Sequence, residues 1–436
     1  MRTTRIDWRV ILGALPLIVL LLFLCSSRLS TSVTMGHPEP LDDLPTFVAA
    51  SSAIRAGENP YDVANIQRHL PDSSMKAYPY VYTPVLAQIL SLVSIHSYWD
   101  LQDVWTVVSA VLLSLWLVYT VKMSGVLIRQ ARGYQQEHPI IEEMQLFRRW
   151  QPFLLLGAAC VLPLSYLMLN GQLEPLLLPL LTIAIILVLQ GRHTAAGILI
   201  GSVLVIKHAA LFLVIWLLIR RSWKTLGWMS VTGCSSIILS IMLFGIEPWH
   251  QFFASVLRHT STAVEDMGIP LYDGYNLSFV GMVTRLGLEH SALITVVGVL
   301  LCVSVCVCLL WIQLRRERSR PMEEIMILAL AFFLVLPYFW TYHLMYVAAP
   351  TIAICAQMIM KPFIRTKNRM IALISMTIAF VVAPGTLLWK VTSRLGLDVP
   401  ADISGTITTI LLIVSMFFFC RSLYEQPQRT QHAGVV

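Results

Sequence analysis

The sequence predicts an all-α polytopic membrane protein with about twelve transmembrane helices. Its 436 residues are 57% hydrophobic and only 13% charged, a composition that excludes an ordinary soluble enzyme. Many apolar runs approach the about 20 residues that a helix needs to cross a hydrocarbon core of about 30 Å. Such continuous runs also exclude a β-barrel, whose strands alternate between apolar and polar residues.

The apolar runs predict the spans in chain order. The first follows Arg2, Arg5 and Arg9 and has no A-x-A cleavage site after it, so we expect an uncleaved helix with its amino end inside. Two segments are ambiguous, because 80–95 is short and 194–219 contains Lys207 and His208 in its middle. The clear runs lie at about 8–25, 102–124, 152–168, 173–190, 225–244, 289–312, 323–338, 342–360, 369–388 and 405–420.

The distribution of basic residues decides between two ways of threading the ambiguous segments. If 80–95 lies along the outer interface and 194–219 breaks at Lys207, then 22 of the 31 Lys and Arg residues are cytoplasmic. If both segments span intact, only 16 are cytoplasmic. The positive-inside rule favours the first threading. The halves of 194–219 then form a broken hairpin with Lys207 at its apex. Non-helical backbone at membrane depth is tolerated only where it lines a cavity.

This threading gives one integral membrane domain, 1–436, with both termini cytoplasmic. It has a large first extracytoplasmic loop (26–101) bearing interfacial helices, a cytoplasmic loop (122–151) and a second extracytoplasmic loop (245–288). Four polar groups meet at its outer face together with loop 245–288, so we expect an extracytoplasmic active site. They are Asp42 with Asp43, Asn170-Gly171-Gln172, Lys207-His208 and Trp340-Thr341-Tyr342-His343.

Composition and missing motifs exclude several other functions. The net charge of +7 is concentrated in short loops between apolar runs, which orients helices and does not indicate nucleic-acid binding. The eight cysteines lie in or beside apolar runs and indicate neither a disulfide framework nor a zinc site. The chain has no P-loop, dinucleotide fingerprint or D-x-D motif. An activated sugar would therefore arrive on another carrier, such as a polyprenyl phosphate, and we expect no cofactor or metal.

Two charged residues stand out. Asp43 precedes a short amphipathic segment, Thr46 to Ala56, that ends at Gly57. It is either a general base near the bilayer surface or only the N-terminal cap of that helix. Lys207 lies among apolar neighbours, where an ammonium needs a negative partner. That partner is either a substrate phosphate or an acid of the chain such as Glu174.

Other polar and aromatic residues have two possible roles each. Asn170-Gly171-Gln172 is either a plain turn or part of a site. His343, at the outer end of a helix, is either structural or a donor to a phosphate oxygen. The aromatic residues of the outer face would form an interfacial belt, and some could stack on a sugar. They are Tyr61, Tyr78, Tyr80, Tyr82, Trp99, Trp105 and Trp249.

The order of short motifs resembles the GT-C class of polyprenyl-phosphate-sugar-dependent glycosyltransferases, and within it family 87, which contains mycobacterial mannosyltransferases. Thr83 departs from the family's usual paired prolines, Phe47 from a common tyrosine, and Tyr338 from a usual small residue. The motifs are DLPTF (43–47), AGENPYD (56–62), YVYTPVL (80–86), NGQ (170–172), AGILIG (196–201), KHAA (207–210), YNLS (275–278) and PYFWTYH (337–343).

The resemblance implies a GT-C-like fold and an inverting transfer of a mannose-like hexose from polyprenyl phosphate to a lipid or glycan acceptor, at the outer face of the plasma membrane. Asp43 would be the base and Asp42 a possible second acid. The donor's phosphate and sugar would be bound by Lys207, His343, Gln172, Asn276, Asn170 and Tyr82. The alternative is a transporter or flippase of a lipid-linked sugar. The chain shows no second broken helix of the kind that inverted-repeat transporters have.

Overall fold

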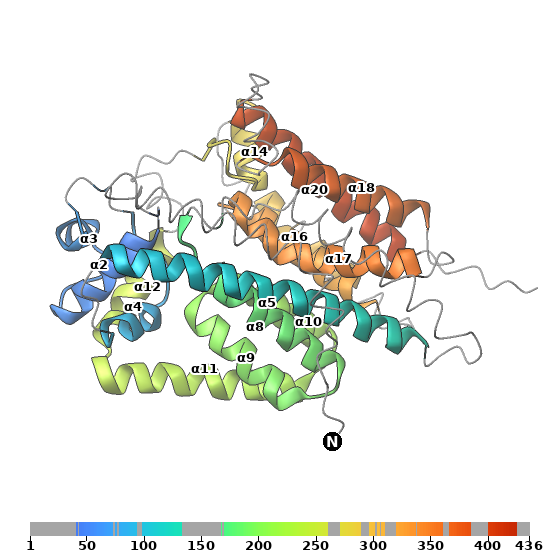
Figure 1. Cartoon of the computed structure of the whole chain (residues 1–436). Helices are drawn as coiled ribbons and strands as arrows, with labels where there is room; N and C mark the ends of the chain where they lie inside the picture. The colour runs from blue at the N-terminus through green and yellow to red at the C-terminus, as the bar shows by residue number, and fades with distance from the viewer. Residues whose placement is uncertain are drawn as a thin grey trace, which may run out of the picture.

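The structure is a computed structural model, and all of its regular elements are helices among the residues that it describes (Figure 1). One isolated β-bridge pairs Asn276 with Trp340. The described residues are 41, 43–72, 75, 78–93, 98–132, 167, 170–259, 271–288, 296–300, 303–305, 307–309, 320–336, 338–360, 366–384 and 400–424. The predicted runs 8–25 and, apart from Leu167, 152–168 lie outside them, as does Asp42.

The helices follow the predicted runs wherever these are described. Their bounds are α2 Leu44–Arg55, α3 Val63–His69, α4 Pro84–Ser91, α5 Tyr98–Arg132, α8 Glu174–Leu189, α9 His193–Ile206, η1 His208–Ala210, α10 Leu211–Ile219, α11 Trp223–Phe244, α12 Glu247–His259, α14 Phe279–Arg285, α16 Pro321–Val335, η2 Thr341–Leu344, α17 Met345–Met360, α18 Lys367–Val382 and α20 Ala401–Tyr424.

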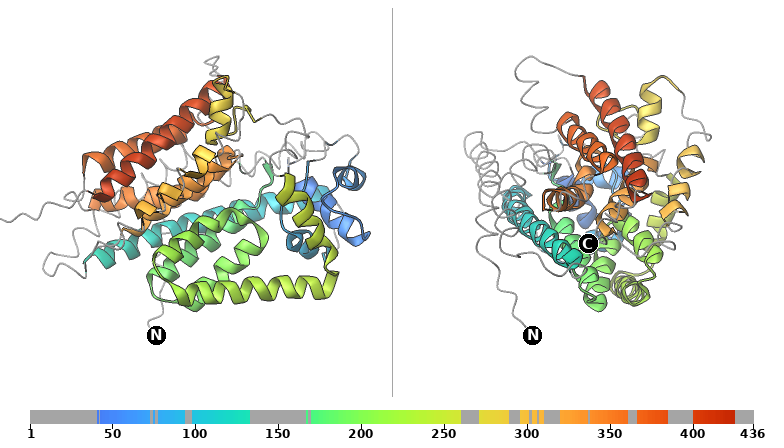
Figure 2. Two further views of the ribbon diagram at one scale, coloured as in Figure 1. Left: turned by 180° about the vertical axis from the view of Figure 1, so that it is seen from behind. Right: turned by 90° about the vertical axis from the view of Figure 1, so that its right-hand side faces the viewer.

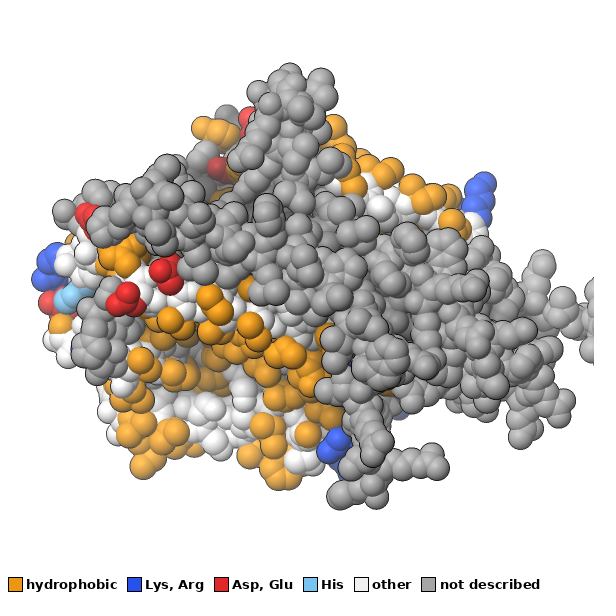
Figure 3. Space-filling model, in the orientation of Figure 1, with side chains coloured by type: hydrophobic (Ala, Val, Ile, Leu, Met, Phe, Trp, Pro, Cys, Tyr) orange, Lys and Arg blue, Asp and Glu red, His pale blue; other side chains and the backbone are white. Residues whose placement is uncertain are grey.

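Three described helices are long and apolar enough to cross a bilayer: Tyr98–Leu127, Trp223–Phe244 and Ala401–Leu423. Apolar side chains also cover their outer surface. On α11, Ile238, Met242 and Leu243 are each more than half exposed, and Figure 3 shows such apolar side chains over α5 and the helices below it. An exposed apolar surface this extensive fits lipid and not water. The chain is therefore a membrane protein.

Helix α5 lies beside two groups of helices, which also contact each other directly through α10 and α16. Figures 1 and 2 show α8 to α11 on one side of it and α16 to α20 on the other. It packs against α8 in the first group and against α17 in the second. Helices α18 and α20 form a closely packed pair at the edge of the second group.

The segment 194–219 is broken at Lys207, as its charge predicts. Lys207 ends α9 with extended backbone angles, φ −142° and ψ 124°. Helices α9 and α11 run in parallel, since Gly197 faces Thr225 and Gly201 faces Met229 and Thr232. The short α10 between them must therefore return toward the start of α9. The three elements α9, η1 and α10 form a hairpin whose apex carries Lys207.

Ion pairs join the helices at the end of the molecule where this hairpin opens. Glu324 of α16 pairs with Arg220 at 2.9 Å, and Glu323 pairs with Arg369 of α18. Arg320 donates to the carbonyl oxygen of Ser422, in α20, at 2.9 Å. These contacts bring the ends of α10 and α20 to the starts of α16 and α18, which is the alternating order that the threading requires.

The short helices α2, α3, α4 and α12 gather at the opposite end, at the left of Figure 1. Helix α4 begins with Pro84 and has only 8 residues, far too few to span a bilayer. We expected α2 to be an interfacial helix with one wet face. Instead, Thr46, Ala49 and Ser51, which lie outside the expected apolar face, are also almost fully buried, and α2 packs against α3 and α4. The expected aromatic belt is likewise partly internal, because Tyr61, Tyr80, Tyr82 and Trp249 are buried.

Candidate active site

Asp43 stands at the N-cap position of α2, but its side chain does not cap the helix. Its backbone N–H donates to the carbonyl oxygen of Asn170 at 2.8 Å. Its carboxylate oxygen Oδ2 accepts a hydrogen bond from the side-chain amide of Gln172. The side chain is therefore directed toward the 170–172 turn, and the interpretation of Asp43 as a mere cap is not what the structure shows.

The turn needs a glycine at its centre for two reasons. Gly171 has φ +67°, in the left-handed region that side chains with a Cβ disfavour. A Cβ at this position would also lie only 2.8 Å from the Cβ of Leu41 and 3.0 Å from that of Leu44. Gly171 thus lets the turn approach the start of α2, and this close approach brings Gln172 to Asp43.

A chain of hydrogen bonds leads from Asp43 to the apex of the hairpin. The hydroxyl of Tyr82 donates to Gln172 Oε1 at 2.9 Å, and Lys207 Nζ donates to that hydroxyl at 3.3 Å. Every donor in this chain points toward Asp43, which fixes the orientation of the Gln172 amide. Burial raises the pKa of Tyr82, and the nearby carboxylates of Glu174 and Asp43 raise it further, so Tyr82 stays a neutral phenol.

Lys207 is paired with Glu174, the acid named from the sequence as its possible partner. The distance from Nζ to Glu174 Oε1 is 2.5 Å, and the two residues are 7% and 0% exposed. The ammonium also lies 5.0 Å from the ring centre of Tyr82 and 5.4 Å from that of Tyr342. Rings at this distance favour a positive charge. The site therefore holds a buried cation between two aromatic faces, with one carboxylate beside it.

His343 lies next to this cation site in a stack of aromatic rings. Its ring centre is 4.4 Å from that of Tyr342 and 5.3 Å from that of Phe333. Its Nδ1 accepts a hydrogen bond from the Trp340 backbone N–H at 3.1 Å. If the imidazole is neutral, its proton is then on Nε2, and Nε2 is a hydrogen-bond donor.

Asn276 has a different environment from the other candidates. Its amide nitrogen donates to the Leu271 carbonyl oxygen at 3.0 Å, and its Oδ1 accepts from the Phe339 N–H at 3.0 Å. The side chain is fully buried. It ties the 271–278 loop to the segment before η2, so it supports the Trp340-to-His343 segment from outside the Lys207 cluster.

Two further tyrosines of the site have no role in the sequence predictions. Tyr342 lies beside Lys207, and the hydroxyl of Tyr346 donates to Glu174 Oε1 at 3.4 Å. They are four residues apart across the junction of η2 and α17, the spacing that puts side chains on one helical face. This spacing, next to His343, is the sequence signal that could have identified both tyrosines as site residues. Asn170 contributes its backbone carbonyl to Asp43, and its side chain is buried.

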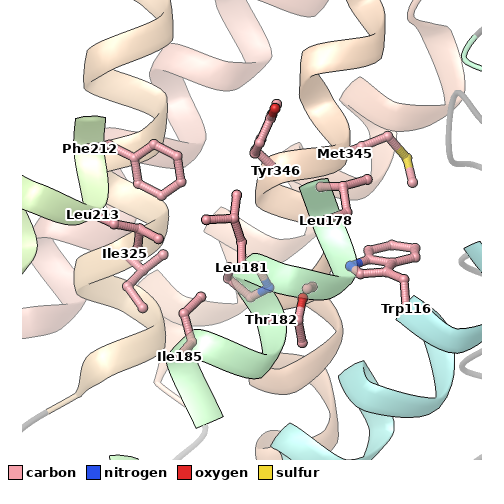
Figure 4. A pocket seen from close by; sticks show the side chains of 12 residues that line it. Trp116, Leu178, Leu181, Thr182, Ile185, Phe212, Leu213, Ile325, Met345 and Tyr346 are labelled. Atoms are coloured by element: carbon pink, nitrogen blue, oxygen red, sulfur yellow. The ribbon is translucent and has the colours of Figure 1, made fainter. Parts of the chain in front are cut away.

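A small cavity lies beside Tyr346, lined by side chains of α5, α8, α10, α16 and α17 (Figure 4). Its volume is about 20 Å³, enough for about one water molecule and not for a sugar. Apart from Thr182, Trp116 and Tyr346, its lining is entirely apolar. Among the described residues, no group of three His, Cys, Asp or Glu side chains could hold a metal ion.

Comparison with known proteins is consistent with this geometry. The sequence model of glycosyltransferase family 87 matches residues 80–337. This range includes Tyr82, Gln172, Glu174 and Lys207. No curated protein matches the chain. The match covers more than half of the 436 residues. The chain thus belongs to glycosyltransferase family 87, and the buried polar cluster lies largely within the part that defines its membership.

Proposed function

We propose that the protein is an inverting glycosyltransferase that moves a hexose, mannose-like in its stereochemistry, from a polyprenyl-phosphate carrier to a hydroxyl of a lipid or glycan acceptor. The observation that carries this proposal is the hydrogen-bond chain between a carboxylate, Asp43, and a buried ammonium, Lys207. A displacement at a sugar carbon needs a base for the incoming hydroxyl and a positive charge for the leaving phosphate. The protein supplies the base with Asp43 and the positive charge with Lys207, at the two ends of one hydrogen-bond network.

In the proposed reaction, Asp43 accepts the proton of the acceptor hydroxyl. The acceptor oxygen forms a bond to the anomeric carbon from one face. The bond from that carbon to the phosphate oxygen breaks on the other face, and its electron pair stays with polyprenyl phosphate. The configuration at the anomeric carbon is inverted. General-base assistance of this kind is worth about 10²–10⁴ in rate.

Lys207 stabilises the charge that develops on the leaving phosphate, and the Nε2–H of His343 is a second donor for it. Both side chains are buried among aromatic rings, where a hydrogen bond to a charged group is stronger than in water. Gln172 and Tyr82 hold the base and the cation in register, and Asn170 and Asn276 position their neighbours. Asp42 is a second acid for the acceptor site. The reaction needs no metal ion.

The site belongs at the outer face of the plasma membrane, since the basic ends of the helices lie opposite it. Arg220, Arg320 and Arg369 gather at the far end of the bundle, and basic residues favour the cytoplasmic side. A lipid-linked donor fits the apolar exterior. The broken hairpin alone would also suit a transporter of lipid-linked sugars, but that function has no use for a carboxylate beside Gln172.

The test is transfer of radiolabelled sugar from a panel of synthetic polyprenyl-phosphate sugars by the purified full chain in nanodiscs. Asp43→Asn and Lys207→Ala are compared with the wild type, and Lys224→Ala, at an exposed position near the start of α11, serves as the control. We expect one donor to be used, transfer to be lost in both site variants and the control to be unaffected. Near-normal transfer by folded Asp43→Asn would overturn the base assignment. Movement of a labelled lipid across the bilayer without any transfer would favour the transporter.

A further inference from the structure

We propose that Glu174 is an exchangeable counter-ion, which pairs with Lys207 while the site is empty, gives way to the lipid phosphate of the donor, and returns to Lys207 to expel the polyprenyl phosphate product. This inference rests on the proposed function, in which Lys207 binds that phosphate. It assigns Glu174 a role in substrate exchange and not in the chemical step.

The first support is that Glu174 is only half satisfied. Its Oε1 accepts from Lys207 at 2.5 Å and from Tyr346 at 3.4 Å. Its Oε2 is buried and has no hydrogen-bond partner among the described residues. A buried carboxylate oxygen without a donor costs free energy. The Glu174–Lys207 pair therefore leaves unmade the hydrogen bonds that a permanent ion pair would have at Oε2.

A second buried glutamate of the chain shows what a permanent pair looks like. Glu324 Oε2 accepts from Trp216 Nε1 at 3.1 Å and from Arg220 Nε at 2.9 Å. Its Oε1 accepts from the Arg320 backbone N–H at 3.4 Å. Both oxygens of Glu324 have partners, and one partner is a guanidinium. The contrast indicates that the Glu174 pair is built for exchange and the Glu324 pair for stability.

The third support is that both members can part at moderate cost. Lys207 lies in the extended break between α9 and η1 and has a flexible four-carbon stem. Glu174 is the first residue of α8, where the positive end of the helix stabilises a carboxylate after its partner leaves. The rings of Tyr82 and Tyr342 stay beside the ammonium whichever anion it contacts.

The charges of substrate and product give this exchange a direction. The donor is a phosphodiester with one negative charge, and the transfer leaves a phosphate monoester with up to two. A carboxylate fixed beside the phosphate site repels two charges more than one. Glu174 therefore weakens binding of the product more than binding of the donor. Without it, product would remain on Lys207 and block the next donor.

The experiment measures binding and inhibition by farnesyl phosphate, a monoester, and by its mannosyl diester, on the full chain in nanodiscs. Glu174→Gln keeps the size of the side chain and removes its charge. We expect about tenfold tighter binding of the monoester, a smaller gain for the diester and stronger product inhibition. Glu324→Gln, which also loses a buried charge but at the far end of the bundle, should leave both affinities unchanged. Glu174→Asp keeps the charge but holds it farther from Lys207, so its gain in monoester affinity should be smaller than that of Glu174→Gln.

Unchanged or weaker monoester binding in folded Glu174→Gln would overturn the inference and make Glu174 a structural support of Lys207. If Glu174→Gln does not fold, Glu174→Asp decides the question. Its shorter side chain draws the carboxylate back from Lys207, so we expect a gain in affinity that is larger for the monoester than for the diester. No gain, or an equal gain for both, would overturn the inference. These failures leave transfer by the wild type intact. A wild type that neither transfers sugar nor binds farnesyl phosphate would instead contradict the proposed function.

Discussion

Gln172 donates a hydrogen bond to the carboxylate of Asp43 across 129 positions of the chain. The same amide accepts from Tyr82 with its oxygen at 2.9 Å. Both ends of the Gln172 side chain are thus committed, so its amide nitrogen faces Asp43 and holds that carboxylate in place.

Replacing Gln172 with Glu puts a second carboxylate against Asp43. Two carboxylates in contact resist being ionised together, and the shared proton would occupy the base. We expect transfer at neutral pH to fall by at least about 100-fold, with partial recovery as the pH rises and the proton is lost. Initial rates measured across pH with the preferred donor test this. Transfer at the wild-type rate at neutral pH would show that Asp43 is not the base.

Tyr82→Phe removes the hydroxyl that joins Gln172 to Lys207 but keeps the ring. The ring still packs edge-on against Phe47, 5.0 Å between centres, so we expect the variant to fold, with a thermal midpoint lowered by the loss of two buried hydrogen bonds. The loss of two hydrogen bonds worth about 1 kcal/mol each should lower transfer about tenfold or more. The measurement is kcat and KM for the donor in nanodiscs.

The matched control for this change is Tyr61→Phe. The Tyr61 hydroxyl donates to the backbone carbonyl of Tyr82 at 3.0 Å and does not contact Gln172 or Lys207. Its loss should affect stability about as much as any buried hydrogen bond and leave the donor KM unchanged. Equal effects of the two variants on transfer would mean that the Tyr82 hydroxyl is structural only.

Much of the architecture follows from charge and apolar length. The break at Lys207 could be predicted because an ammonium in the middle of an apolar run is costly unless the helix opens there. The nearness of Asp43, the 170–172 turn and Lys207 followed from counting basic residues, since this places all three at one face. That 80–95 does not span was also predicted from the basic residues, since its length alone left it ambiguous.

Other features depend on contacts that the local pattern does not contain. The amphipathic pattern of α2 cannot distinguish a lipid interface from the protein helices α3 and α4, and the structure has the second arrangement. The ion pair between Lys207 and Glu174 depends on how α8 lies beside the hairpin. Asn276 was predicted to bind the donor, and no local pattern indicates that it is fully buried and bound to backbone groups.

The 170–172 turn offers a test of how tightly the base is positioned. Gly171→Ala places a methyl group 2.8 Å from Leu41 Cβ at a backbone φ of +67°. We expect a loss of stability at the upper end of the about 1–3 kcal/mol that such a conformation costs a residue with a Cβ, and a severe loss of transfer. Gly57→Ala has nearly the same backbone strain, φ +72°, but no atom within 4 Å of the new Cβ.

Thermal unfolding and transfer are measured for both glycine variants in the same nanodiscs. Gly57→Ala should lose only the strain energy and keep its transfer rate. If Gly57→Ala impairs transfer as much as Gly171→Ala, then the close contact with Leu41 does not position Asp43.

The position of Lys207 depends on how closely α9 approaches α11. A Cβ on Gly201 would lie 2.7 Å from the Met229 carbonyl oxygen and 2.9 Å from Thr232 Cβ. Small residues four apart, here Gly197 and Gly201, allow such contact between membrane helices. Gly201→Ala must push α9 away from α11, and the hairpin apex moves with it. We therefore expect a lower thermal midpoint and at least about tenfold weaker binding of the monoester phosphate, because Lys207, which binds the phosphate, is displaced.

In the control Gly227→Ala, on the same pair of helices, the new Cβ has no atom within 4 Å. Since Ala favours a helix by about 1 kcal/mol over Gly, that variant should be at least as stable as the wild type and bind phosphate normally. Normal phosphate binding by Gly201→Ala would show that the apex is held by Thr83, which donates to the Val205 carbonyl, and not by the α9–α11 contact.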